Sequence, residues 1–198
     1  VECRSQVSEL ASPCLIKIYG NFEKSIFSTE IVFHLHKKIP LSLMFKAIYI
    51  CTYKNGDFDL LEDEKFCSEL NELFYDMIVK DNTTLRHVRL MARRIVNEDS
   101  KIDRKGTLFS CILPKVRDED VPDRLRNIFT NFVLVHVRDP KNRVFFLAEM
   151  TRRMVFYYLG ETYKTYPNVP KSDRDSLKNK RLDTSGTLFM ELIGDLYK

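Results

Sequence analysis

The 198-residue sequence contains no tryptophan and only six glycines. It has no glycine-rich phosphate loop, and no Ser/His/Asp or Cys/His grouping of the kind found in nucleophilic enzymes. A free-standing nuclease or nucleotide-binding enzyme is therefore a weak interpretation. No apolar run approaches the roughly 18 residues that a membrane span requires, so we do not expect a membrane protein.

Cysteine and histidine spacing gives little support to a metal site. The five cysteines are an odd number at irregular spacings, without the C-x-x-C pairs of zinc sites or a disulfide framework. We expect reduced thiols, as in a cytosol or nucleus. His34 and His36 would share one face of a strand, but the sequence offers no third ligand nearby, so two surface imidazoles are favoured over a metal site. No metal or other cofactor is expected in this chain. The cysteines are Cys3, Cys14, Cys51, Cys67 and Cys111.

Length and composition are those of one globular domain. The hydrophobic content of 44% and the charged content of 30% are typical of soluble proteins. A chain of this length can bury a core of its own, so residues 1–198 are treated as one domain. The sequence begins at Val1, without an initiator methionine or a secretion signal. This start favours a piece cut from a longer polypeptide.

The hydrophobic pattern predicts an α+β fold, in which mixed helices and short antiparallel strands form a single compact domain. Residues 15–19 and 26–35 have the β-branched, alternating character of strands, and a hairpin through 20–24 connects them. A short apolar piece at 108–113 could be another strand, and 131–136 reads as extended chain. Gly160 is expected to end the fifth helix. Helices are predicted at 41–50, with Pro40 in the first turn, and at 60–79, 84–96, 121–132, 144–159 and 184–196.

Charge is distributed unevenly along the chain, although the formal net charge is only +4. Between residues 57 and 76 eight acids face a single cation, Lys65, and from Arg86 onward the balance reverses. A globule with one acidic and one basic side suits a module that presents its basic side to a polyanion. The eight acids are Asp57, Asp59, Glu62, Asp63, Glu64, Glu69, Glu72 and Asp76.

Three arginines of the helix predicted at 84–96 are candidate nucleic-acid contacts. At 100° per residue, Arg86, Arg89 and Arg93 fall within about 60° of one another, opposite the apolar side of the helix. For a charge run a solvated face is the usual explanation, and we take it as the more common outcome here. Against it, neither Arg89 nor Arg93 has an acid four residues away within this helix.

A dense group of charges lies at residues 173–183, directly before an apolar helical segment. The loop resembles the end of the lobe domain in the second-largest, beta-like subunit of multisubunit DNA-directed RNA polymerases. That family usually has Asp-x-Asp, a His-Tyr-Gly-like trio, Asn or Lys, two basic residues, Leu-Asp and then a Gly. Ser176-Leu177-Lys178 replaces the trio here. The matching residues are Asp173, Asp175, Asn179, Lys180, Arg181, Leu182, Asp183 and Gly186.

Other segments resemble the same family in the same order. Residues 1–5, Val-Glu-Cys-Arg-Ser, are similar to the Glu-x-Arg-Ser entry into the lobe. Residues 39–48 resemble the apolar segment that starts with Ile-Pro and ends in Phe-Arg-Ala-Leu-Gly. Residues 131–137 resemble the Phe-Leu-Pro-His-Val piece, with Val135 at the usual proline, and 145–154 resemble the Phe-Phe-Leu-Gly-x-Met-x-x-Arg-Leu helix that follows.

The resemblance implies a non-catalytic part of a nucleotidyltransferase. In the family the lobe forms one wall of the DNA cleft, and the catalytic Mg²⁺ is held by another subunit. The bacterial loop that matches Asp175 and Lys180 helps to hold a non-template base. We carry this role to Asp175, Asn179, Lys180 and Arg181 as a hypothesis, since such side chains can read a base or neutralise phosphate. Local ion pairing is the favoured explanation of Asp173 and Asp175 over a metal site.

The resemblance also implies partners and leaves an alternative open. Other RNA polymerase subunits and DNA are the expected partners, and the family's lobe also receives transcription initiation factors. The chain could therefore be chiefly a protein-docking module, with the acidic segment 60–79 as its contact. The Asp-Arg-Asp-Ser form of the loop is similar to enzymes of large nucleocytoplasmic DNA viruses. It implies viral transcription in host cytoplasm or a virion; a cellular source would imply the nucleus.

Overall fold

The computed structural model describes residues 2–5, 14–32, 34–80, 86–98, 103–112 and 116–162, together with Phe189 and Ile193. The loop predicted to contact DNA at 173–183 lies outside the described residues. So does nearly all of the helix predicted at 184–196. Within that segment Phe189 is exposed and Ile193 is half-buried.

Four antiparallel strands form one sheet in the order β1-β2-β3-β4. They are β1 (Glu2–Ser5), β2 (Cys14–Asn21), β3 (Ile26–Ile31) and β4 (Ile39–Pro40). Side chains of β2 alternate between buried and half-exposed, as a sheet with one covered face requires. The predicted hairpin is confirmed, with a turn between β2 and β3.

The predicted continuation of the second strand to residue 35 is wrong. β3 ends at Ile31, where the backbone N–H groups of His34 and Leu35 both donate to the Ile31 carbonyl and close a turn. His34 and His36 therefore do not share a strand face. The His34 ring instead packs against Phe132, with ring centroids 4.2 Å apart.

The first helix, α1 (Leu41–Tyr53), is buried on nearly all sides and forms the centre of the core. The predicted Asn55–Gly56 turn follows it, and both residues have positive φ. The acidic helix predicted at 60–79 is divided into a 3-10 turn, η1 (Phe58–Leu61), and α2 (Glu64–Val79). Asp63 divides them because its carboxylate accepts the backbone N–H groups of Lys65 and Phe66 and caps α2.

The second half of the chain is helical. It contains α3 (Arg86–Asn97), α4 (Arg104–Phe109), the 3-10 turn η3 (Asp118–Asp120), α5 (Val121–Asn131) and α6 (Pro140–Thr162). The strand predicted at 108–113 is wrong: Asp103 caps α4 by accepting the Gly106 N–H, and a turn follows. Residues 132–136 form turns rather than extended chain, and Gly160 lies inside α6 instead of ending it.

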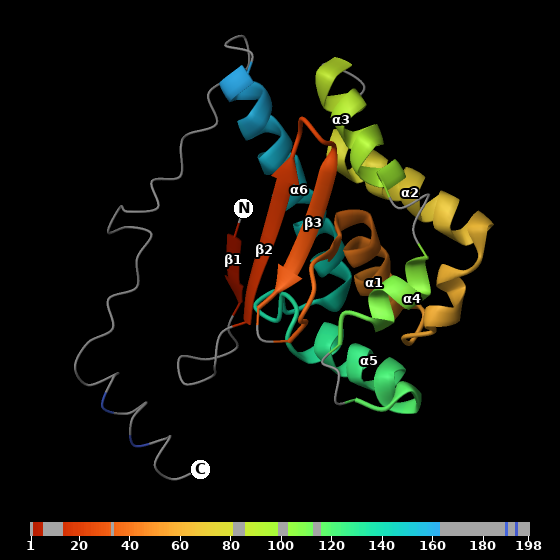
Figure 1. The fold of residues 1–198 in the computed structure, drawn as a ribbon. Coiled ribbons are helices and arrows are strands. Elements are labelled where there is room, and N and C mark those ends of the chain that lie inside the picture. The colour runs from red at the N-terminus through yellow and green to blue at the C-terminus, as the bar shows by residue number, and fades with distance from the viewer. Residues whose placement is uncertain are drawn as a thin grey trace.

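The helices pack on one another and on the sheet in a mixed α+β domain (Figure 1). α1 contacts β3, β4, α2, α3, α5 and α6, which explains its near-complete burial. The sheet meets α6 where Phe22 stacks on Tyr158, with ring centroids 3.8 Å apart. Over the described part of the chain, the model has no helix that is both long and apolar enough to cross a membrane.

Two charged side chains fix helix ends to the core. Glu98, directly after α3, accepts the Phe27 N–H of β3 with both carboxylate oxygens at 2.9 Å. Arg143 of α6 is buried and donates to the carbonyls of Phe129 and Thr130 at the end of α5. The guanidinium thereby satisfies carbonyls that a helix C-terminus leaves without partners. Burial lowers the pKa of Arg143 from its usual value.

Candidate nucleic-acid interface

The helix α3 is amphipathic, as its sequence predicts. Val88, Ala92, Ile95 and Val96 are buried against the core. Arg86 and Arg93 lie on the exposed side, but Arg89 is half-buried. The prediction that these three arginines share an exposed face is therefore correct for Arg86 and Arg93 but not for Arg89. The same exposed side also carries His87, Leu90, Arg94 and Asn97.

Arg93 has a partner on the neighbouring helix. Its guanidinium donates to the carboxylate of Glu72 in α2 and lies over the ring of Tyr75, 3.9 Å from the centroid. The hydrogen bond from Arg93 to Glu72 is the main reason why the pKa of Arg93 is raised. Sequence spacing within α3 does not reveal this pair, because Arg93 and Glu72 belong to different helices. Of the two exposed candidate residues, Arg86 and Arg93, the charge of Arg93 is thus partly neutralised within the chain.

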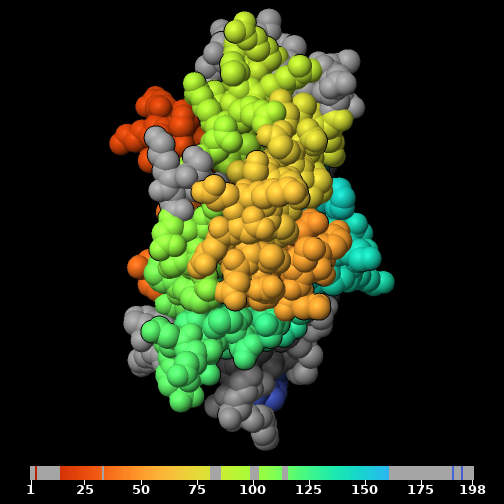
Figure 2. Space-filling view, turned by 90° about the vertical axis from the view of Figure 1, so that its right-hand side faces the viewer, coloured from red at the N-terminus to blue at the C-terminus, as the bar shows by residue number. Residues whose placement is uncertain are grey.

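Basic α3 and acidic α2 lie side by side on one face of the molecule (Figure 2). Figure 2 shows α3 in yellow-green above the yellow and orange α2. The exposed acids of α2 would repel a phosphate backbone, whereas the exposed cations of α3 would attract it. A polyanion on this face is therefore confined to the α3 end. The exposed acids of α2 are Glu64, Glu69, Glu72 and Asp76.

The structure thus locates three of the seven predicted DNA-contacting residues. Arg86, Arg89 and Arg93 are within α3, while the other four lie outside the described residues. The four are Asp175, Asn179, Lys180 and Arg181.

A second basic cluster surrounds Glu149 on α6. One carboxylate oxygen lies 3.0 Å from the Lys80 Nζ and 3.9 Å from Arg152, and the other lies 3.2 Å from the Arg153 Nε. Burial alone would raise the pKa of Glu149, but hydrogen bonds from Lys80 and Arg153 outweigh it and lower that pKa. Spacing along α6 alone does not show that Lys80 joins Glu149 from the end of α2. The Arg152–Arg153 pair inside an apolar helix was the available signal.

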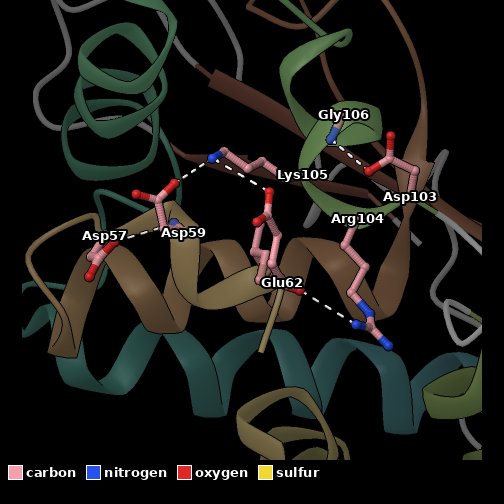
Figure 3. Close-up of polar contacts among 8 residues, drawn as sticks. Asp57, Asp59, Glu62, Asp103, Arg104, Lys105 and Gly106 are labelled. Carbon is pink, nitrogen blue, oxygen red and sulfur yellow. Dashed lines mark hydrogen bonds and ion pairs between the residues drawn. The ribbon is translucent and has the colours of Figure 1, made fainter. Parts of the chain in front are cut away.

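A pocket of about 390 Å³ opens where the 54–59 turn and η1 meet α4 and α5. Two cations that line it have acidic partners. Lys105 forms ion pairs with Asp59 and Glu62 (Figure 3), and Arg126 donates to Asp123. Figure 3 also shows the Asp103 cap on the Gly106 N–H. The arrangement joins η1 to α4, and these charges are satisfied without a ligand.

Thiol and metal chemistry have little basis in the described segments. No group of three or more His, Cys, Asp or Glu residues among them could hold a metal ion. All five cysteines are free thiols. Burial raises the pKa of Cys14 and Cys111 to about 11 and that of Cys51 to about 12, so these thiols are protonated near neutral pH.

Compared with protein-family models and with curated proteins, the sequence matches none.

Proposed function

We propose that the chain is a non-catalytic lobe of a DNA-dependent RNA polymerase subunit that forms one wall of the DNA cleft. One observation carries the proposal: four motif segments and the 173–183 loop follow the family's order over almost the whole chain. In this role the chain binds and guides DNA, and the Mg²⁺ needed for nucleotide transfer belongs to another subunit.

The fold supports the proposal by bringing apolar motif segments together. Residues 39–48 form β4 and most of α1, and residues 145–154 lie in α6. Although about a hundred residues separate them, α1 and α6 pack against each other. Residues 2–5 form β1 beside β2. Motifs that build one core are expected to recur together in a family for packing reasons, while the charged loop carries the contact with the ligand.

The DNA contact in this proposal is electrostatic. Arg86 and Arg93 on α3, together with Lys180 and Arg181, supply cations to phosphates. Each phosphate contact contributes about 0.9 to the slope of log affinity against log salt for duplex DNA. The acids of α2 restrict the duplex to one side. In this proposal Asp175 and Asn179 distinguish a base in the unpaired strand.

The assignment is tested first in the host of this protein. A tagged polypeptide containing this chain should purify with the other subunits of an RNA polymerase. The assembled enzyme should then lose promoter-opening or elongation activity on charge reversal of Lys180 and Arg181, and this loss relative to the wild type should shrink as salt rises. Arg117→Glu, which changes an exposed arginine paired to Asp120, is the matched control. Purification without polymerase subunits refutes the proposal.

A second candidate function is docking of a transcription initiation factor on α2. The observation that favours it is the exposed acidic side of α2, which carries Glu69 and Asp76 in addition to the Glu72 that pairs with Arg93. A basic partner surface would fit there.

Glu72→Gln distinguishes the two functions because it should change DNA binding and factor docking in opposite directions. Loss of the carboxylate releases Arg93, so DNA binding by α3 should strengthen and gain about 0.9 in salt slope. Docking of a basic partner on α2 should weaken. The readouts are DNA affinity of the assembled enzyme over a salt series and capture of initiation factors. If neither quantity changes, the face formed by α2 and α3 serves neither function.

A further inference from the structure

The outer side of α6 presents two exposed aromatic rings with a charged cluster between them. At steps of four residues, Phe145, Glu149, Arg153 and Tyr157 form one ridge of the helix. Phe145 is 53% exposed and Tyr157 is 47% exposed, although both belong to a helix that is otherwise packed into the core. Both rings therefore offer an accessible face on which a ligand could stack.

Charge on this ridge is strongly unbalanced. Lys80, Arg152 and Arg153 all lie within 4 Å of the single carboxylate of Glu149, so the four groups carry a net charge of two positive units. The cations remain accessible, since the side chains of Lys80 and Arg153 are 51% and 70% exposed. Glu149 therefore gathers the cations without neutralising them.

The backbone at Lys80 is strained. Lys80 follows the last residue of α2 with φ 57° and ψ −40°, and a positive φ is unfavourable for a residue that has a Cβ. The strained backbone places its ammonium beside α6, 3.0 Å from Glu149. Strain of this kind is commonly found where the side chain has a binding role.

We propose that this ridge, defined by Lys80, Phe145, Arg152, Arg153 and Tyr157, binds single-stranded nucleic acid. Sites for unpaired strands combine cations that follow the backbone with aromatic faces on which bases stack. Phe145 and Tyr157 are about 18 Å apart along the helix, which spans roughly five nucleotides at 3.4 Å each. The cations lie between them, where the backbone passes.

A protein partner fits the ridge less well. The centre of a protein–protein interface is depleted of charge, whereas the centre of this ridge is its charged cluster. The cation of Arg152 also lies 5.2 Å from the ring centroid of Phe156, a pairing of guanidinium and aromatic ring that single-strand sites share. These residues are separate from the α3 arginines and from the 173–183 loop. The proposal for the ridge can therefore be refuted while the proposed function of the chain is retained.

The test uses the full 198-residue chain and an oligothymidylate of about 20 nucleotides, with a duplex of equal length as comparison. Backbone NMR shifts at low salt report even weak binding and show where it occurs. We expect shifts along α6 and at Lys80 with the single strand, and smaller ones with the duplex. Shifts confined to α3, or none on α6 at millimolar oligonucleotide, overturn the proposal, and the surface then serves a protein partner or none.

Two variants distinguish a binding role from a structural one. Lys80→Gly removes a cation and relieves the strained φ, so the fold should be as stable or more stable while the single-strand salt slope falls by about 0.7. Tyr157→Leu should weaken binding about tenfold by removing a stacking face. Arg117→Gln, at an exposed arginine outside the ridge, is the control and should change nothing. Unchanged affinity in both ridge variants overturns the proposal.

Discussion

Gly56 and Gly160 should respond to the same substitution with opposite signs. Gly56 has φ 77°, and a Cβ built there would lie 2.5 Å from the Nε of Arg126. At Gly160, inside α6, a Cβ would meet nothing within 4 Å. Both substitutions add the same methyl group. A difference between their effects on stability therefore reports the backbone conformation and the close contact at Gly56.

The cost of Gly56→Ala has two parts. A left-handed backbone costs a residue with a Cβ about 1–2 kcal/mol. Arg126 must also move, and in doing so it breaks its 2.8 Å hydrogen bond to Asp123. That pair is largely exposed, so its loss adds at most about 1 kcal/mol. Together the free energy of unfolding should fall by about 2 kcal/mol, which corresponds to a Tm lower by roughly 4–8 °C for a chain of this size.

Gly160→Ala should instead raise the free energy of unfolding by about 0.5–1 kcal/mol, since alanine loses less backbone entropy in a helix. Urea unfolding followed by far-UV circular dichroism gives both values from one chain, provided the slope of the transition is unchanged. The reasoning is refuted if Gly56→Ala leaves the midpoint unchanged, or if Gly160→Ala lowers it. Either result would mean that the backbone at these positions differs from the one described.

Ionisable groups give three more measurable outcomes. Burial lowers the pKa of His34 and His136, so their stabilising effect is complete above the unfolded pKa near 6.5 and is lost as pH falls below it. Urea midpoints should decline from pH 7 to 5, less so in the double His→Gln variant. Iodoacetamide at pH 8 should modify Cys51 in urea but not in the native protein, by mass spectrometry. Arg143→Met should cost about 1–3 kcal/mol in urea unfolding, because carbonyls of α5 lose their donor.

Local periodicity accounts for the parts of the fold that the sequence predicted well. The β2 alternation, with Ile16 and Ile18 buried, and the apolar side of α3 repeat over enough residues to indicate both the element and its face. Pro122 marks the start of α5 because proline needs no N–H donor in a first turn. These signals depend on neighbours along the chain, which a sequence displays directly.

Short segments were predicted less well because competing local signals decide them. The piece at 108–113 is apolar enough for a strand, but the Asp103 cap starts a helix just before it. Gly160 is a common helix terminator, yet α6 continues past it because its preceding turns are packed against α1, α2 and α3. Tertiary packing overrides a single unfavourable residue when its cost is about 1 kcal/mol.

Charge pairing across elements is the part of the candidate site that sequence spacing could not reveal. Arg93 has no acid four residues away in α3, but Glu72 reaches it from α2. Glu149 does have arginines three and four residues away, yet Lys80 joins them from a position 69 residues earlier. Sequence spacing within single helices therefore made α3 look more positively charged than it is, and it did not reveal the cluster on α6. Lys80, Arg152 and Arg153 keep a net positive charge because they share one carboxylate, and that property exists only in the folded molecule.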